Sequence, residues 1–344
     1  MVNKVILESI QKINELKQLL TTRSKIVITT HQNPDGDAIG SVLGLSLFFQ
    51  KCGHEVQPIV PNEYPEFLQW LPDNKTVINY NKRKKTADQI FAEADMIFQL
   101  DYNDSKRIND MQNIVNSVKA KKIMIDHHPY PQLNVDFSLS SITVSSTAEL
   151  IYEFIHALDG GDLIDKSIAT CIYTGILTDT GCFSYNSSHA RTFEIVSQLL
   201  MLKIEKDEIY RHVYENFSAR RMQLLGYCLN EKMQVFPEFN TALITINMEE
   251  QKRYDFATGD SEGFVNLPLS IKGVHFSAFF MEKKDKIKIS FRSRGKFPVN
   301  SFSEKYFSGG GHTNASGGES ELSLNDTIKK FIDLLPQYAQ DLKT

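Results

Sequence analysis

The sequence predicts an α/β protein: an N-terminal domain with a mostly parallel, doubly wound sheet, a smaller C-terminal α+β domain, and a cleft between the two. Three observations support this fold class. The 344 residues give room for two domains of ordinary size. Short β-branched segments alternate with helical segments through the first half of the chain. Beyond about residue 235, strands of alternating polar and apolar residues replace that pattern.

The elements of the N-terminal half follow from the spacing of apolar residues. A first amphipathic helix is expected within residues 1–20. Strands are expected at Lys25–Thr30, Glu55–Val60, Met96–Leu100 and Lys122–Ile125. Helices are expected at Ala38–Lys51, Thr147–Leu158, Asp165–Leu177 and Ala190–Leu202. Strands separated by helices indicate βαβ units, and such units make neighbouring strands parallel.

The C-terminal part has a different pattern. Strands are expected at Thr241–Asn247, Val274–Glu282 and Lys286–Ser293, followed by a glycine-rich loop at Ser308–Gly318 and a last helix at Asn325–Leu342. The segment between the two patterns is polar and helical. We therefore expect domains at residues 1–203 and 236–344, joined by a helical linker at 204–235.

Composition and charge exclude several classes of protein. The chain has 38 Lys and Arg against 42 Asp and Glu, a net charge of −4, whereas proteins that hold long nucleic acids usually carry a basic excess. We find no signal peptide and no apolar run long enough to cross a membrane. The four cysteines lack the spacing of a thiolate zinc site. These features predict a cytoplasmic protein without a membrane partner.

Acidic and histidine residues follow three of the predicted strands. In open α/β sheets the ligand site lies beyond the carboxyl ends of the strands, so residues from separate strands meet there. A further acidic residue ends an apolar helix in TGILTDTG. The set comprises His31, Asp35 and Asp37 after the first strand, Asp101 after the third, Asp126, His127 and His128 after the fourth, and Asp179 at the helix end.

This concentration of carboxylates predicts a metal centre. Two like charges 4 Å apart repel by about 4 kcal/mol at an effective dielectric constant of 20. Two divalent ions would nearly balance five carboxylates, and oxygen with imidazole ligands suits Mn²⁺ or Mg²⁺. Each motif taken alone also fits a structural role, such as a helix cap or a turn.

The four motifs together resemble those of the DHH phosphoesterase superfamily. HQNPDGDAIGS, Asp101 in QLDYND, the DHH tripeptide and TGILTDTGCFSY each match one of its motifs. The resemblance implies that His31 and Asp35 hold one metal ion, that Asp37, His127 and Asp179 hold the other, and that Asp101 bridges the two. It also implies that His128 contacts phosphate or assists proton transfer, while Asp126 orients the neighbouring histidine.

Two features of the C-terminal domain predict a phosphate-binding surface. Arg292 and Arg294 share one face of a strand with alternating residues, which is either an ordinary solvated face or a phosphate-binding ridge. The loop containing Gly309, Gly310, Gly311 and His312 lets backbone N–H groups approach an anion, although a glycine-rich hairpin is the plain alternative. The passage resembles the DHH-associated C-terminal domain, except that Ser308 stands where many relatives have a glycine. The resemblance implies that these residues bind a nucleotide.

The expected function is that of a Mn²⁺-dependent phosphoesterase with two ions per active site. It would hydrolyse oligoribonucleotides of about two to five residues to mononucleotides, with a metal-activated water as the nucleophile, and 3′-phosphoadenosine 5′-phosphate to AMP. One alternative is a phosphodiesterase for cyclic di-AMP or its linear product. Another is a non-catalytic nucleotide- or RNA-binding module. The partners would be short RNAs and small nucleotides. The sequence leaves a homodimer open.

Overall fold

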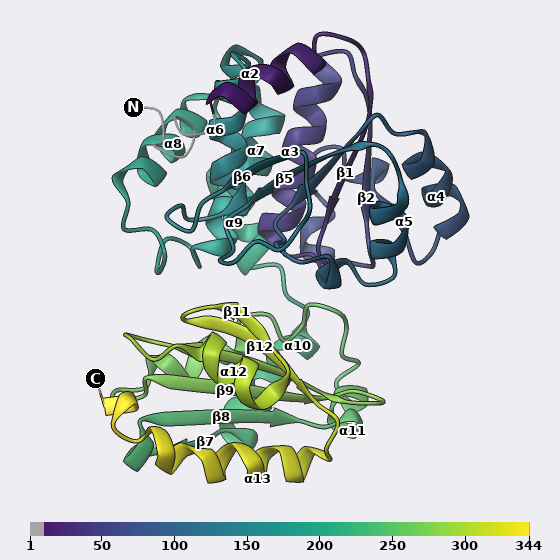
Figure 1. Cartoon of the computed structure of the whole chain (residues 1–344). Helices are drawn as coiled ribbons and strands as arrows, with labels where there is room; N and C mark the ends of the chain where they lie inside the picture. Colours follow the sequence, from purple (N-terminus) through teal and green to yellow (C-terminus); the bar gives the residue numbers. More distant parts are fainter. Residues whose placement is uncertain (1–9, 344) are drawn as a thin grey trace. The chain divides into compact units, whose positions relative to one another are not determined.

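The computed structural model describes residues 10–343 and divides into two compact units (Figure 1). The first unit ends at Asn216 and the second begins at Phe217. The first described element is α2 (Ile10–Leu19). The start of the predicted first helix, at residues 1–9, lies outside the described residues.

A six-stranded parallel sheet forms the centre of the first unit, as the sequence predicts for this half of the chain. Its strand order is β3-β2-β1-β4-β5-β6. The strands are β1 (Lys25–Thr30), β2 (Glu55–Val60), β3 (Ile78–Asn79), β4 (Met96–Leu100), β5 (Lys121–Asp126) and β6 (Phe137–Ser140). The sequence analysis does not include β3 or β6. β3 has only two residues, too few to show a period, and β6 is a short segment in which only Phe137 and Leu139 are apolar.

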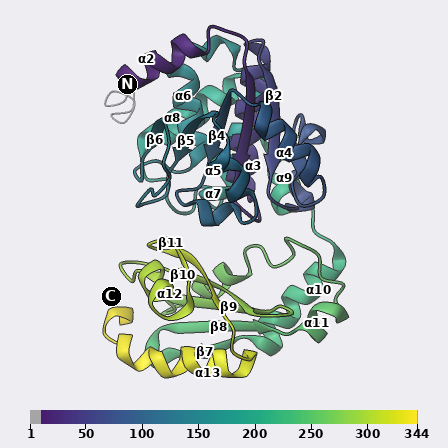
Figure 2. The same cartoon turned by 45° about the vertical axis from the view of Figure 1, so that its right-hand side comes forward.

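Helices cover both faces of this sheet (Figures 1 and 2). On one face Ile26 and Ile28 join a core that includes Phe48, and on the other face Val27 packs in a cluster with Phe91. The first face carries α3 (Gly36–Lys51), α6 (Thr147–Ala157) and α7 (Lys166–Asp179), and the second carries α4 (Lys84–Glu93) and α5 (Met111–Ser117). The remaining helices are α8 (Ala190–Met201) and α9 (Lys206–Tyr214). Because alternate strand residues point to opposite faces, the apolar runs bury both sides.

Glycines let α3 and α7 approach closely. A Cβ on Gly40 would lie 2.5 Å from the carbonyl oxygen of Cys171, and one on Gly36 would lie 2.4 Å from Oγ1 of Thr178. No side chain fits at such distances without movement of the neighbouring helix. The close packing determines where the first turn of α3 lies relative to the last turn of α7.

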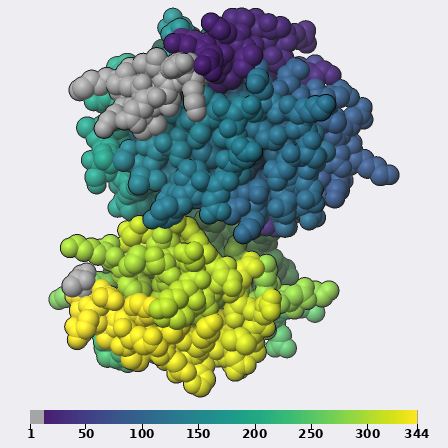
Figure 3. Space-filling view, in the orientation of Figure 1, coloured from purple at the N-terminus to yellow at the C-terminus, as the bar shows by residue number. Residues whose placement is uncertain are grey.

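A second six-stranded sheet, of order β11-β12-β10-β9-β8-β7, forms the centre of the second unit. Only β8 and β9 are parallel within it. The strands are β7 (Gln234–Phe236), β8 (Thr241–Ile246), β9 (Phe276–Glu282), β10 (Ile287–Ser293), β11 (Gly310–His312) and β12 (Ala315–Ser320). The helices are α10 (Ala219–Tyr227), α11 (Met248–Arg253), α12 (Val299–Phe307) and α13 (Leu324–Leu334). An aromatic core that includes Phe291, Phe302 and Phe331 joins the sheet to α12 and α13, and α13 lies at the surface (yellow in Figure 3).

The second unit differs from the sequence prediction in two places. The predicted glycine-rich loop at 308–318 is a hairpin, in which Gly310 pairs with Gly317 and His312 with Ala315. The predicted last helix ends at Leu334, and a short 3₁₀ turn that contains Pro336 follows, because proline cannot continue an α-helix.

The predicted linker at 204–235 is helical, but its two helices belong to different units. Helix α9 packs against α7 in the first unit, and α10 lies within the second. None of the helices that the structure describes combines the length and the apolar character needed to span a bilayer.

Candidate metal centre

The predicted acidic and histidine residues of the first unit gather at one edge of its sheet. The strand order reverses between β1 and β4, and in doubly wound sheets this is where ligands bind. His31 follows β1 and Asp101 follows β4, while His127 follows β5. Because β1, β4 and β5 are neighbours in the sheet, their carboxyl ends bring these residues together.

His31, Asp35 and Asp101 form a first group whose potential ligand atoms lie within 4.8 Å of one another. Nε2 of His31 lies 3.2 Å from Oδ2 of Asp101 and 3.9 Å from Oδ2 of Asp35. Asp35 is also the N-cap of α3, where its Oδ1 accepts a hydrogen bond from the N–H of Ala38. The cap therefore uses one carboxylate oxygen, and the other faces His31.

Asp37, His127 and Asp179 form a second such group. Nε2 of His127 lies 3.9 Å from Oδ2 of Asp37 and 3.6 Å from Oδ2 of Asp179. Asp37 lies in the first turn of α3 and Asp179 is the last residue of α7. The glycine-mediated packing of these two helices therefore helps to assemble this group.

Asp101 lies between the two groups. Its Oδ2 faces His31, whereas its Oδ1 is 3.5 Å from Nε2 of His127. The residue is 2% exposed and has a φ of +62°, a left-handed conformation that is uncommon outside glycine. Non-glycine residues held in such conformations cluster at active sites. One carboxylate oxygen thus faces each group of potential ligands.

His128 and Asp126 form a pair beside these groups. Nδ1 of His128 lies 2.8 Å from Oδ1 of Asp126 and 3.5 Å from Oδ1 of Asp101. Asp126 is fully buried, so a hydrogen bond to it fixes the orientation of the imidazole.

The carboxylates raise one another's affinity for protons. Burial, together with the charges of Asp101, Asp179 and Asp35, raises the pKa of Asp37 well above its usual value. Burial also raises the pKa of Asp101. Ionised carboxylates this close need a compensating positive charge, and the donors are oxygen and imidazole without thiolate. The residues therefore fit hard or borderline divalent cations such as Mn²⁺ and Mg²⁺.

The structure adds two contributors that the sequence reasoning missed. The first is Arg107, whose positive charge opposes the rise in the pKa of both His31 and Asp101. It lies in a short 3₁₀ turn (Ser105–Ile108) after β4, and its carbonyl oxygen accepts a hydrogen bond from the N–H of Gln32. An arginine in a polar turn gives no sequence signal of its own, so only the fold reveals it.

The second missed contributor is the N-terminus of α6. The N–H groups of Thr147 and Ala148 donate to Oδ2 and Oδ1 of Asp37 at 2.7 and 2.8 Å. The hydroxyl of Thr147 donates to Oδ1 of Asp101 at 3.0 Å. A sequence signal exists, because Ser146 and Glu149 have the S-x-x-E spacing of a capping box and Ser146 is the N-cap. That signal locates a helix start but not the carboxylates that it contacts.

The predicted nucleotide-binding residues of the second unit lie around the β11–β12 hairpin. Arg292 is in β10 opposite Ala315 of β12, and Arg294 lies just beyond the end of β10. A Cβ on Gly309 would lie 1.9 Å from the carbonyl oxygen of Gly317. Packing is therefore a sufficient reason for glycine at this position, whether or not it contacts a ligand.

The neighbouring glycines differ in the space around them. A Cβ on Gly311 would lie 2.6 Å from the carbonyl oxygen of Ala315, whereas one on Gly310 would meet nothing within 4 Å. His312 ends β11. The backbone around Gly310 is thus open to a ligand, while Gly309 and Gly311 are also needed for the hairpin itself.

Comparisons with known proteins agree with this architecture. The N-terminal domain of the DHH family matches residues 25–176, and the DHHA1 domain matches residues 241–341. The bifunctional oligoribonuclease and PAP phosphatase NrnA of Bacillus subtilis is 26% identical over 324 residues, covering 93% of this chain and 96% of that protein.

Solved structures show the same relationship. An exopolyphosphatase-related protein from Bacteroides fragilis is 45% identical and has a TM-score of 0.93, covering 97% of this chain and 98% of that chain. RecJ from Thermus thermophilus in complex with Mn²⁺ shares the fold at 13% identity, with a TM-score of 0.56 over 96% of this chain and 54% of that one. The chain therefore belongs to the DHH family and carries a DHHA1 domain as its second unit.

Proposed function

We propose that this protein is a metal-dependent phosphoesterase that hydrolyses oligoribonucleotides of about two to five residues to mononucleotides and 3′-phosphoadenosine 5′-phosphate to AMP. The observation that carries the proposal is the pair of ligand groups on either side of Asp101. The curated relative from Bacillus subtilis, which is similar over nearly the whole chain, bears both activities in its name.

The proposed metal ligands are His31, Asp35 and Asp101 for one ion and Asp37, His127, Asp179 and Asp101 for the other. Bound divalent ions would supply positive charge to the phosphate and lower the pKa of an attacking water. We propose Mn²⁺ as the ion, because it accepts both carboxylate and imidazole ligands. RecJ from Thermus thermophilus, a protein of the same fold, binds Mn²⁺ in one structure and Mg²⁺ in another, which supports a divalent ion of this class.

The protein's own side chains would position the substrate and supply a proton to the leaving group. We propose that Asp126 holds Nδ1–H of His128, so that Nε2 of this ring is presented to the substrate to contact phosphate or to pass a proton to the leaving oxygen. Arg292, Arg294, the open backbone at Gly310 and His312 would bind the nucleotide. A substrate with few phosphates needs few cations, which agrees with the net charge of −4.

The test is release of mononucleotides from 5′-phosphorylated ApA in Mn²⁺, with a chelator control and Mg²⁺ in parallel. We expect release of AMP that the chelator abolishes. Equal or faster hydrolysis of cyclic di-AMP would favour a signalling phosphodiesterase instead. Mn²⁺ binding without any hydrolysis of either dinucleotide or of 3′-phosphoadenosine 5′-phosphate would leave only a nucleotide-binding module.

A further inference from the structure

A cavity of about 320 Å³ in the second unit has three basic residues in its lining. Lys272 and His275 come from the segment before β9, and Arg294 comes from the end of β10. Among the described residues that line the cavity, none is acidic. In a chain with a net charge of −4, three basic groups around one hollow without an acidic neighbour indicate an anion site.

The backbone of the cavity also suits an anion. Gly273 and Gly295 line it, and both have a positive φ, of +84° and +80°. A Cβ on Gly273 would meet nothing within 4 Å, so the space beside its Cα is open. Exposed peptide N–H groups at such turns bind anions, and an arginine fork matches the oxygens of a phosphate.

Hydrogen bonds join the walls of this cavity to the β11–β12 hairpin. The N–H of Arg294 donates to the carbonyl oxygen of His275 at 2.8 Å, which connects the two basic segments. Asn314, in the turn of the hairpin, donates from Nδ2 to the carbonyl oxygen of Gly295 at 3.0 Å and to Oγ of Ser293 at 2.8 Å. The cavity is therefore next to the segment proposed to bind the nucleotide.

The metal centre and this cavity attract phosphate in different ways. The acidic cluster repels phosphate unless cations are bound, whereas Lys272 and Arg294 carry positive charge at neutral pH without any metal. We propose that the basic cavity binds a phosphate of the substrate other than the one that is hydrolysed, so that the enzyme selects substrates with a second phosphate. This inference rests on the proposed function and specifies its substrate class.

The test compares ApA, which has one phosphate, with 5′-phosphorylated ApA, which has two. Wild type should have the higher kcat/KM on 5′-phosphorylated ApA, and Lys272→Ala should reduce this preference about tenfold, the effect of one hydrogen bond to a charged group. Lys272→Arg should retain it. Lys284→Ala is the matched control, because it removes the same charge from the exposed turn at the other end of β9 and β10.

A second measurement separates this inference from the proposed function. Binding of both dinucleotides is measured by calorimetry in chelator, where no turnover occurs. Tighter binding of 5′-phosphorylated ApA that Lys272→Ala weakens supports the cavity, even if neither dinucleotide is ever hydrolysed. Equal binding of 5′-phosphorylated ApA by wild type and Lys272→Ala overturns it, even if hydrolysis is observed. A preference for ApApA over ApA that Lys272→Ala also reduces would identify the second phosphate as a diester rather than a 5′-terminal group.

Discussion

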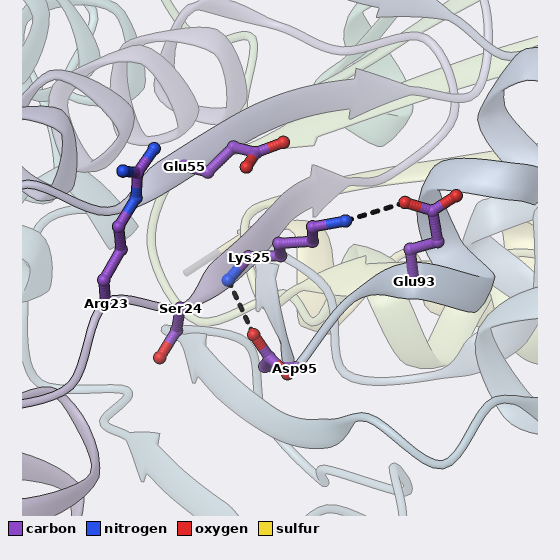
Figure 4. Close-up of a pocket in the computed structure, with 6 residues that line it drawn as sticks. All are labelled: Arg23, Ser24, Lys25, Glu55, Glu93 and Asp95. Carbon is purple, nitrogen blue, oxygen red and sulfur yellow. Dashed lines mark hydrogen bonds and ion pairs between the residues drawn. The ribbon is translucent and has the colours of Figure 1, made fainter.

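Acidic side chains have opposite surroundings at the two ends of the parallel sheet in the first unit. At the amino end, Nζ of Lys25 lies 2.8 Å from Oε2 of Glu93, and the N–H of Lys25 donates to Oδ2 of Asp95 at 2.7 Å (Figure 4). At the carboxyl end, Asp37 and Asp101 are buried together, and their pKa values are raised. The acidic side chains at the amino end are paired with a lysine, whereas those at the carboxyl end are crowded together with more negative charge than their neighbours offset. This difference distinguishes a structural surface from a functional site.

The volume of a cavity does not identify the functional site in this protein. The hollow at the amino end, lined by Arg23, Lys25 and Glu55 among others, has a volume of about 560 Å³ and is larger than the basic cavity of the second unit. Its charged residues are of both signs, and Lys25 already interacts with Glu93 and Asp95. Charged side chains that already pair with each other attract a charged ligand only weakly.

Substitution of Asp101 is the strongest test of the difference between the two ends of the sheet. Asp101→Asn keeps the shape of the side chain but removes the charge that faces both ligand groups, so we expect turnover to fall to background. The number of Mn²⁺ ions bound, measured by calorimetry, should fall below two. Glu93→Gln, the corresponding change at the amino end, should leave turnover at the wild-type level. Two bound ions and undiminished turnover in Asp101→Asn would contradict the bridging role.

Thr147 tests whether the start of α6 is part of the carboxyl-end site. Thr147→Val removes the hydroxyl that donates to Asp101 but retains the N–H that donates to Asp37. Loss of such a supporting contact typically costs about 10–100-fold in metal affinity or activity. We expect a fall of that size in Mn²⁺ affinity, with recovery in Thr147→Ser. If Val and Ser variants bind Mn²⁺ equally well, the hydroxyl has no part in positioning Asp101.

Gly40 tests how far the carboxyl end depends on close helix packing. A methyl group there would lie 2.5 Å from the carbonyl oxygen of Cys171, so Gly40→Ala forces α3 and α7 apart. We expect a loss of about 1–3 kcal/mol in the free energy of unfolding by urea. Gly226→Ala in α10 is the control, since its Cβ meets nothing within 4 Å, and there alanine should stabilise the helix by up to about 1 kcal/mol. Equal effects at the two positions would contradict the packing argument.

Much of this site is predictable because each motif is a short segment next to one predictable strand or helix. The apolar run before His31 predicts a strand, and the rule that ligands bind at carboxyl ends then places His31 near Asp101 without any structure. Thr147 could not be found in this way, because its hydrogen bonds to Asp37 and Asp101 join segments far apart in the chain. Arg107 could not be found either, because an arginine in a polar turn gives no sequence signal. The glycine-rich segment shows a further limit. Sequence reasoning assigned its glycines to ligand binding, yet Gly309 and Gly311 have no room for a side chain.

Ser308 shows how structure explains a departure from the family pattern. It follows α12 with a φ of +47° and a ψ of +41°, the left-handed conformation that glycine adopts most easily. A glycine at this position would therefore suit the end of the helix. The departure leaves the hairpin intact and says nothing against nucleotide binding.

The smallest expected effect is the pH dependence of stability, and its sign differs between the two ends. Burial raises the pKa of Asp101, so in chelator the folded state binds this proton more tightly than the unfolded chain. The stability gained from the protonated carboxyl is present below the usual aspartate pKa and is lost as pH rises through the raised pKa. The hydrogen bond and charge of Lys25 lower the pKa of Glu93, so its contribution is present above the usual glutamate pKa of about 4.3 and is lost as pH falls below it.

Urea unfolding of the metal-free protein between pH 4 and pH 8 measures how each carboxylate changes the free energy of unfolding with pH. Asp101→Asn should stabilise the protein most at the alkaline end of this range, and the gain should shrink as the pH falls and wild-type Asp101 takes up its proton. Glu93→Gln should cost little, because the pair is exposed, and that cost should begin to shrink only at the acid end, where the unfolded chain starts to take up its proton. A gain for Asp101→Asn that is independent of pH would mean that the buried carboxylate is already protonated, and the two ends would then differ in packing rather than in charge.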